Sequence, residues 1–247
     1  MKNFLKNPKR VLLFMCFLIC SCSKDLSFEQ ADRLLRENQN KYGFQYFKTQ
    51  NDKFGALQVN GKNLSLFENK FSCTNKYIKF LSVITDKNVE FIPEFDNLEQ
   101  FEIGSKIYEK KDFPIINLNS LNNNIYSLSI YEMKILDIND LYDFKSLKKL
   151  IMRNCIYDGK INYENLSSLI YLEVIDDDRV DFMEFKSLRN LKYLTIRNCK
   201  EVHNLEFIEC LNLEMICFDE KFYESHIVYI NSLKKKFPNM KVFNGIH

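Results

Sequence analysis

LKKLIMRNC (residues 147–155) and LKYLTIRNC (residues 191–199) share one pattern and begin 44 residues apart. Halfway between them lies LIYLEV (169–174), one unit earlier lies IYSLSI (125–130), and one unit later lies LEMICF (213–218). The five stretches therefore begin at intervals of 22 residues with no slippage. A repeat this regular predicts a solenoid, because one short unit cannot bury its apolar side alone and must stack against its neighbours.

This unit resembles the leucine-rich-repeat family, whose core is LxxLxL followed two residues later by Asn or Cys. Its length is that of the 22-residue class found in internalin-type bacterial surface proteins. The resemblance covers roughly residues 125–221, and it implies an α/β solenoid with a curved parallel sheet on the concave side. The convex side would hold a 3₁₀ or extended return segment with its own apolar row. We count the first residue of each unit (125, 147, 169, 191 and 213) as position 1. The apolar row then lies at position 17 (Leu141, Tyr163, Phe185, Phe207) and at position 20 (Phe144, Leu166, Leu188, Cys210).

The ninth position of the unit usually satisfies backbone groups in the turn after the strand. Cys155 and Cys199 occupy it here, Asp177 lies between them, and Met133 and Lys221 depart from the pattern. The two cysteines are two strand spacings apart, or about 10 Å. A disulfide needs Cα atoms within about 7 Å, so we expect both to be packed thiols.

Three other cysteines follow the signal region. We expect Cys210 to be packed in the second apolar row and Cys217 to face the concave surface. Cys73 is the remaining cysteine outside the repeats, and it offers Cys217 its only uncommitted partner.

The pattern weakens on both sides of the regular units. LEQFEI (98–103), IKFLSV (78–83) and FGALQV (54–59) fit the strand motif at irregular spacing, with an insertion around 105–118. Residues 51–124 are therefore either degenerate repeats or a separate N-terminal cap.

The two ends are expected to be helical. In residues 222–247, apolar residues at helical spacing over 223–237 predict a capping helix, and 240–243 a last strand. In residues 22–50, Ser27 and Gln30 have the spacing of a capping box and predict a short helix over 26–40, either tether or cap.

Residues 1–21 have the anatomy of a secretory signal peptide: a basic start and a nine-residue apolar run, VLLFMCFLI (11–19), too short to span a bilayer. Ile19-Cys20-Ser21-Cys22 resembles the lipobox of bacterial lipoproteins, which implies that Cys22 is lipidated. An ordinary cleaved signal or a retained N-terminal anchor is the alternative. The resemblance places the protein on a bacterial cell envelope, bound to the membrane through lipid. Ser23, where an aspartate often marks inner-membrane retention, favours the outer membrane or cell surface.

Charge and motifs argue against several classes of function. The chain has a net charge of +2, and removing the four positive charges of residues 1–21 leaves −2, so nucleic acid is not an expected partner. The three histidines are scattered, and the sequence has no nucleophile elbow or glycine-rich phosphate loop. We therefore expect no cofactor, no metal and no enzymatic activity. Asp176–Asp178 with Asp181 is interpreted as a solvated acidic edge.

The concave face is the expected binding surface, because strand alternation directs unit positions 3, 5, 7 and 8 outward. Its candidate ligand-binding residues are Tyr131, Arg153, Tyr171, Glu173, Tyr193, Arg197 and Asp219, and the same positions also contain Glu132, Asn154, Asp176 and Asn198. Tyr and Arg are enriched in binding hot spots. The favoured function is a protein-binding module with a protein ligand. The alternatives are a structural lipoprotein without a specific ligand, and an enzyme or inhibitor that uses segment 41–120.

Overall fold

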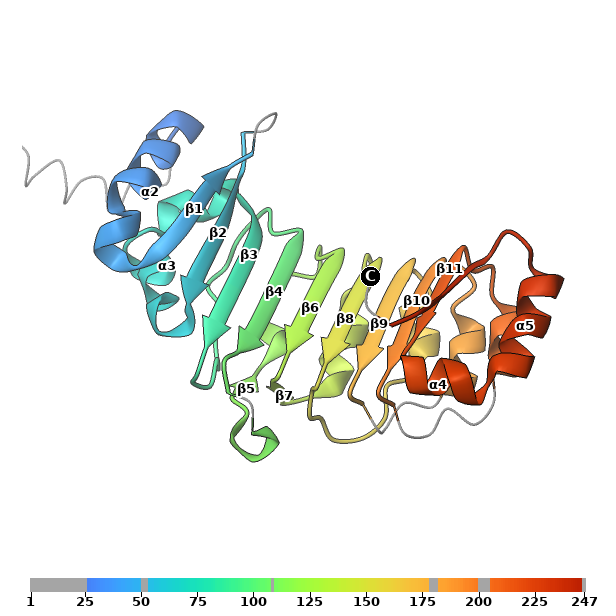
Figure 1. Ribbon diagram of the computed structural model, residues 1–247. Coiled ribbons are helices and arrows are strands. Elements are labelled where there is room, and N and C mark those ends of the chain that lie inside the picture. The colour runs from blue at the N-terminus through green and yellow to red at the C-terminus, as the bar shows by residue number, and fades with distance from the viewer. Residues whose placement is uncertain (1–25, 50–52, 108, 178–181, 200–204, 246–247) are drawn as a thin grey trace, which may run out of the picture.

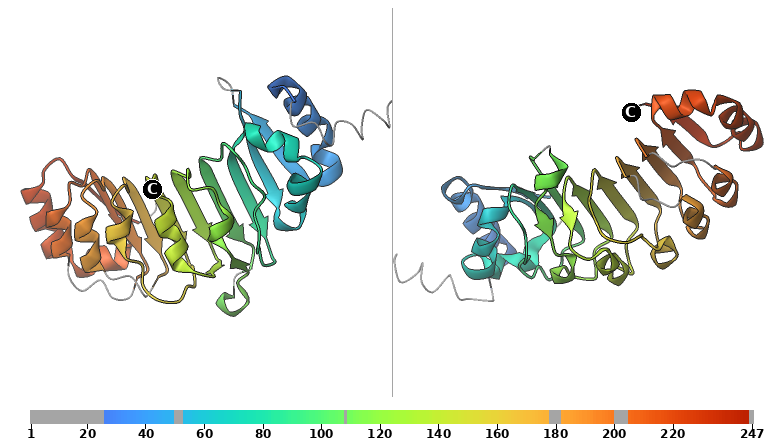
Figure 2. Two further views of the ribbon diagram at one scale, coloured as in Figure 1. Left: turned by 180° about the vertical axis from the view of Figure 1, so that it is seen from behind. Right: turned by 90° about the horizontal axis from the view of Figure 1, so that it is seen from below.

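The computed structural model describes residues 26–49, 53–107, 109–177, 182–199 and 205–245. Within these residues, ten strands form one sheet in the order β1-β2-β3-β4-β6-β8-β9-β10-β11-β12. The β1–β2 pair is antiparallel, and every other neighbouring pair is parallel. The sheet lines the inner side of an arched molecule, and the return segments lie on the outer side (Figures 1 and 2). The fold is therefore the expected α/β solenoid with a curved parallel sheet on its concave side.

The central strands follow the 22-residue repeat in strict register. They are β6 (Ser127–Tyr131), β8 (Lys149–Arg153), β9 (Tyr171–Ile175), β10 (Tyr193–Arg197) and β11 (Met215–Phe218). Their position-4 residues, all fully buried, align across the sheet: Leu128, Leu150, Leu172, Leu194 and Ile216. One unit therefore adds one strand to the sheet and one layer to the core, as the repeat predicts.

The turn after each strand has a conformation that selects its residue type. Asn154, Asp176 and Asn198 adopt φ angles of 52°, 57° and 54°, and Glu132 has 54°. Asn and Asp tolerate this left-handed region better than other non-glycine residues. The next residue closes the turn, since the Cys155 thiol lies 3.4 Å from the Ile130 carbonyl oxygen. The expected role of the ninth position is confirmed there.

The return segments are short 3₁₀ helices, as expected: η5 (Ile138–Asp143), η6 (Tyr163–Leu166), η7 (Phe182–Ser187) and η8 (Glu206–Cys210). Their aromatic row packs edge to face, with ring centroids 4.6 Å apart for Tyr163–Phe185 and 5.6 Å apart for Phe185–Phe207. Cys210 does not extend the second apolar row, because its side chain is exposed. The expectation of a packed thiol at this position is wrong.

Upstream of the regular units the sheet continues without a break. It passes through β2 (Gly55–Asn60), β3 (Ile78–Thr85) and β4 (Gln100–Ser105). Leu57, Leu81 and Phe101 align with Leu128 in the same buried row. The insertion before β6 includes η3 (Lys110–Asp112), β5 (Ile115–Ile116) and η4 (Leu118–Ser120), and β5 pairs with β7 (Lys134–Ile135) in a small second ladder.

The N-terminal end of the solenoid is closed by a helix and a hairpin. Helix α2 (Phe28–Tyr42) begins with the expected capping box, in which Ser27 and Gln30 exchange side-chain to backbone hydrogen bonds. Strand β1 (Phe44–Lys48), which the sequence did not reveal, then pairs with β2. Behind β2 lie η1 (Gly61–Asn63), α3 (Ser65–Asn69) and η2 (Ser72–Tyr77).

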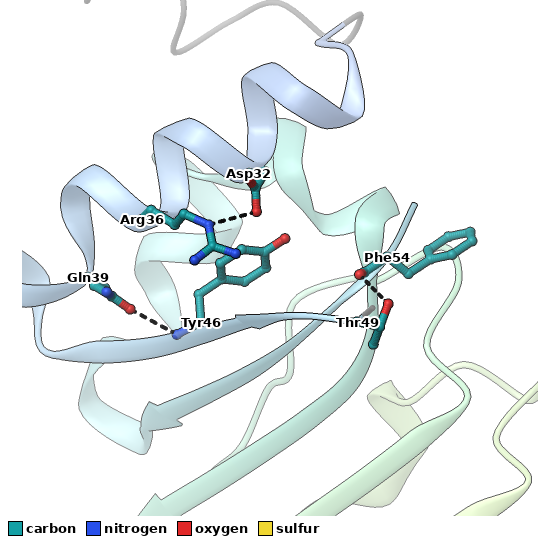
Figure 3. A network of polar contacts seen from close by, with 6 residues as sticks. All are labelled: Asp32, Arg36, Gln39, Tyr46, Thr49 and Phe54. Carbon is teal, nitrogen blue, oxygen red and sulfur yellow. Dashed lines mark hydrogen bonds and ion pairs between the residues drawn. The ribbon is translucent and has the colours of Figure 1, made fainter. Parts of the chain in front are cut away.

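Polar contacts fasten α2 to β1 (Figure 3). The backbone amide of Tyr46 donates to Oε1 of Gln39 at 3.2 Å. The Arg36 guanidinium is bonded to Asp32 at 3.0 Å and lies 5.7 Å from the centroid of the Tyr46 ring. The Tyr46 ring is thereby enclosed between the helix and the hairpin.

The C-terminal end has two helices where the sequence predicts one. Helix α4 (Glu220–Ser225) ends at His226, whose ring stacks on Phe222 with centroids 4.1 Å apart, and α5 (Ile227–Lys236) follows. Ile230 and Leu233 of α5 are buried against the last repeat. Strand β12 (Lys241–Asn244) pairs with β11, as expected for the last strand.

The two cysteines of unknown pairing lie in different parts of the molecule. Cys73 is in η2 and Cys217 is in β11, and both are buried thiols. The Cys217 sulfur lies 3.2 Å from the Gly245 carbonyl oxygen, because the segment after β12 covers it. Cys217 therefore faces the concave side as expected, but its thiol is buried and not exposed.

Candidate binding surface

Three rows of side chains form the concave face of the central strands. Position 5 supplies the middle row, and these residues are buried although they point away from the core: Ser129, Ile151, Glu173, Thr195 and Cys217. Longer side chains at positions 3 and 7 flank this row, and the next strand is only about 4.8 Å away on each side. The position-5 side chains therefore form the buried base of the concave face. The side chains at positions 3 and 7 are the ones that a ligand could reach.

Glu173 is the centre of a polar cluster on this floor. Its side chain is 7% exposed; Oε1 is 2.5 Å from Nη2 of Arg153, and Oε2 accepts a 2.8 Å hydrogen bond from the Tyr171 hydroxyl. Burial, followed by this hydrogen bond, raises the pKa of Tyr171 to about 12. Glu173 was expected to contact ligand, but both of its oxygens are engaged within the protein. The carboxylate holds its two neighbours in place.

Tyr131 extends this cluster toward the N-terminal repeats. The Arg153 guanidinium carbon lies 5.4 Å from the centroid of the Tyr131 ring, a cation–π distance. Burial raises the pKa of Tyr131 above its ordinary value. Tyr131, Arg153, Glu173 and Tyr171 thus form one connected group across β6, β8 and β9.

The expected tyrosine ledge is present beside this cluster. The rings of Tyr171 and Tyr193 are 6.3 Å apart between centroids and inclined by 32°. Two neighbours in this row were not singled out from the sequence: Lys149, whose ammonium lies 5.1 Å from the Tyr171 centroid, and Glu214, which accepts from the Tyr193 hydroxyl at 2.8 Å. Lys149 occupies position 3 of its unit, as the two tyrosines do, so the repeat pattern could have identified it. Glu214 lies just before the first residue of β11, so the pattern of outward-facing strand positions does not include it.

The two arginines of position 7 differ in their electrostatic surroundings. They align in register with Ile175 between them. Arg153 is neutralised by Glu173, whereas Arg197 forms no ion pair with any residue that the structure describes, and its buried Nε has no hydrogen-bond partner. Arg197 therefore carries a positive charge that no carboxylate of the described residues neutralises, and the same holds for Lys149 beside Tyr171.

Asp219 and two of the position-8 residues, Asn198 and Asp176, have structural roles. Oδ1 of Asp219 accepts from the backbone amide of Phe222 at 2.8 Å and caps α4, and Oδ2 accepts from the amide of Asn198 at 3.1 Å. Asn198 in turn donates to Asp176 at 2.7 Å. The sequence placed these polar groups on the binding surface, but their hydrogen bonds hold the turns together.

A hollow separate from the three rows lies beside the concave face, where loops lead into β4, β6 and β8. It has a volume of about 770 Å³ and is open to solvent. Its lining includes Asp96, Glu99, Tyr126, Lys145 and Lys148. The charges are mixed and lie on loops outside the repeat motif, so the repeat pattern gives no sign of this hollow.

Two further observations concern membrane-spanning helices and groups of metal-binding side chains. No helix of the described residues combines the length and apolar character that crossing a bilayer requires. Within the same residues, no three His, Cys, Asp or Glu side chains are grouped so as to hold a metal ion. Cys22, Asp178 and Asp181 lie outside the described residues.

Comparison with known proteins shows a likeness to a solved structure but none to a family model or a curated protein. No family model matches the sequence, and no curated protein matches it. Among solved structures, the chain is similar to an internalin from Listeria monocytogenes, with 18% sequence identity and a TM-score of 0.47. The match covers 72% of this chain and 52% of that one, so this chain spans about half the length of the internalin.

Proposed function

We propose that this protein is lipid-anchored through Cys22 on a bacterial cell envelope and binds a protein partner through its concave face. The observation that carries the binding proposal is the cluster around Glu173. A buried carboxylate holds Arg153 and Tyr171 in fixed positions before any ligand arrives. Side chains that are already ordered lose less conformational entropy on binding.

The proposed contacts divide by chemistry. Tyr131, Tyr171 and Tyr193 would supply aromatic area, and Arg153 would supply a fixed polar edge. Arg197 would supply a positive charge that has no ion pair within the described residues. Glu173 and Asp219 would support these residues without touching the ligand. A partner with an acidic side chain next to an apolar patch fits this arrangement, because the acid would pair with Arg197 and the patch would cover the Tyr171–Tyr193 ledge.

Substitutions at positions 3 and 7 should affect different rate constants of binding, one the dissociation rate and the other the association rate. The partner is first captured by crosslinking on intact cells and identified, and its binding is then measured by surface plasmon resonance. Tyr193→Ala should raise the dissociation rate about tenfold, because buried aromatic contacts govern residence time. Arg197→Ala should flatten the salt dependence of the association rate, because long-range attraction acts on encounter.

Matched controls lie off the concave face. Phe91 and Val228 are exposed hydrophobic residues outside the sheet, and Phe91→Ala and Val228→Ala should bind like wild type. If these changes, or changes elsewhere in 41–120, abolish binding while Tyr193→Ala and Arg197→Ala do not, the concave site is wrong. The absence of any saturable partner would favour a purely structural lipoprotein.

The anchor has its own test. Cys22→Ala should leave an unprocessed precursor and abolish labelling with radioactive palmitate, because the acceptor thiol is gone. Cys20→Ala should be processed and labelled like wild type. A Cys22→Ala chain that still matures and incorporates palmitate would contradict the assignment of the lipid to Cys22.

A further inference from the structure

Corresponding residues of neighbouring loops line the hollow beside the beginnings of β4, β6 and β8, at the upper edge of the sheet in Figure 1. Glu99, Tyr126 and Lys148 each come directly before one of these strands. The Tyr126 amide donates to the Glu99 carbonyl and the Lys148 amide to the Tyr126 carbonyl, both at 2.9 Å, so Tyr126 lies between the other two. Small polar residues lie three residues before β4, β6, β8 and β9: Asn97, Asn124, Ser146 and Ser168. Because neighbouring strands are about 4.8 Å apart, these four follow a line about 14 Å long.

Hydrogen bonds within and between the loops fix the shape of the hollow. The Asn97 side chain donates to a carbonyl of the preceding loop at 2.7 Å, and the Ser168 hydroxyl donates to the Lys145 carbonyl at 3.1 Å. The Tyr126 hydroxyl accepts from Nε2 of Gln100 at 2.5 Å, which holds its partly exposed ring in place. A ligand in the hollow would meet groups that are already ordered, so little conformational entropy would be lost on the protein side.

The charged side chains that line the hollow balance one another. Two are acidic, Asp96 and Glu99, and two are basic, Lys145 and Lys148. Glu99 is paired with Lys79 at 2.9 Å, whereas the other three form no ion pair with any residue that the structure describes. The lining therefore does not select a ligand by net charge. It offers a carboxylate that accepts hydrogen bonds and ammonium groups that donate them, within one hollow.

A ligand with many hydroxyl groups suits this combination. A carboxylate only accepts and an ammonium only donates, whereas each hydroxyl can do both. One sugar hydroxyl could donate to Asp96 while another accepts from Lys145 or Lys148, and such charge-assisted hydrogen bonds are stronger than neutral ones. The Asn124 amide and the Ser146 hydroxyl lie between these groups in the line of loops, and their side chains have no hydrogen-bond partner among the described residues.

We propose that this hollow binds a short neutral oligosaccharide. Its volume of about 770 Å³ is in the usual range for ligand sites, roughly 300–1,000 Å³. The chain of sugar rings would run along the line from Asn97 to Ser168, and the Tyr126 ring would cover the apolar C–H face of one of them. The site is separate from the concave rows, so the inference goes beyond the proposed function and depends on neither the protein partner nor the anchor.

A microarray of neutral oligosaccharides tests the inference. The arrays carry glucose, galactose, mannose and N-acetylhexosamine oligomers, and they are probed with protein matured from the full chain and kept in detergent. Isothermal titration calorimetry then gives the Kd of the strongest ligand. Asp96→Ala and Tyr126→Ala should each weaken binding about tenfold, the loss expected for a hydrogen bond to a charged group or a packed ring. The Kd should change less than about twofold between roughly 50 and 500 mM salt, because the ligand is uncharged.

The controls are exposed charges on the outer side of the solenoid. Glu164→Ala in η6 and Lys186→Ala in η7 should bind like wild type. Asp96 is exposed as well, so its variant tests the site even if Tyr126→Ala folds poorly. The inference is overturned if no neutral oligosaccharide binds above background, or if Asp96→Ala binds as tightly as wild type. Binding of inorganic phosphate or a lysyl-glutamate dipeptide, with no neutral oligosaccharide bound, would identify an ionic site and overturn it too.

Discussion

Leu172→Ala is expected to lower the free energy of unfolding by about 2–5 kcal/mol, the range for truncating a large core residue. Leu172 is fully buried, and its partners in register, Leu150 and Leu194, are fully buried as well. Because a repeat stands on each side, no open end of the solenoid can collapse to fill the cavity. The loss is a large part of the stability of a domain with the usual 5–15 kcal/mol.

Tyr193→Ala provides the control for this change, since it truncates a larger side chain on the same sheet but on the concave face. Its hydroxyl bonds only to the exposed Glu214 among the described residues, so the cost should stay below about 1 kcal/mol. Urea denaturation followed by circular dichroism measures both. Similar midpoints for the two variants would mean that the assignment of strand faces is wrong.

Gly55→Ala is expected to destabilise the N-terminal end by about 1–3 kcal/mol, the usual cost of adding a methyl group to a packed site. A methyl on Gly55 would lie 2.2 Å from Cε2 of Tyr46 and 2.8 Å from its Cζ. The Tyr46 ring is buried between the hairpin and Arg36, so it has little room to move. We expect β1 and α2 to loosen together, visible as faster amide exchange in residues 28–48 by hydrogen–deuterium exchange mass spectrometry.

Gly104→Ala is the matched change two strands away. Its added methyl would meet Cβ of Tyr131 at 3.4 Å, an ordinary contact. The substitution should be neutral or slightly stabilising, because alanine restricts the unfolded chain more than glycine does. If Gly104→Ala costs as much as Gly55→Ala, the close approach of Tyr46 is not the cause.

The sequence by itself determined the repeating part of this protein. The period of 22, the buried position-4 row, the cysteine turns, the 3₁₀ return segments and the capping box at Ser27 all follow from residue type and short-range spacing. These features are predictable because each depends on residues close together in the chain. Each unit also stacks on its neighbours in the same way, so the same local structure recurs from one unit to the next. The spacing of 22 residues also predicted the tyrosine ledge, since Tyr171 and Tyr193 occupy the same position in adjacent units.

Only the tertiary structure decided which groups on the concave face are occupied. Glu173 and Asp219 point to that face by alternation, yet Glu173 is engaged by Arg153 and Tyr171, and Asp219 caps α4. Arg197 shares its position with Arg153 but lacks an ion pair among the described residues. Strand β1 and the break at His226 were equally invisible in the pattern. The Arg153–Glu173 ion pair joins side chains 20 residues apart on neighbouring strands. The periodicity of one unit carries no information about the side chains of the next, so the sequence pattern could not predict this pair.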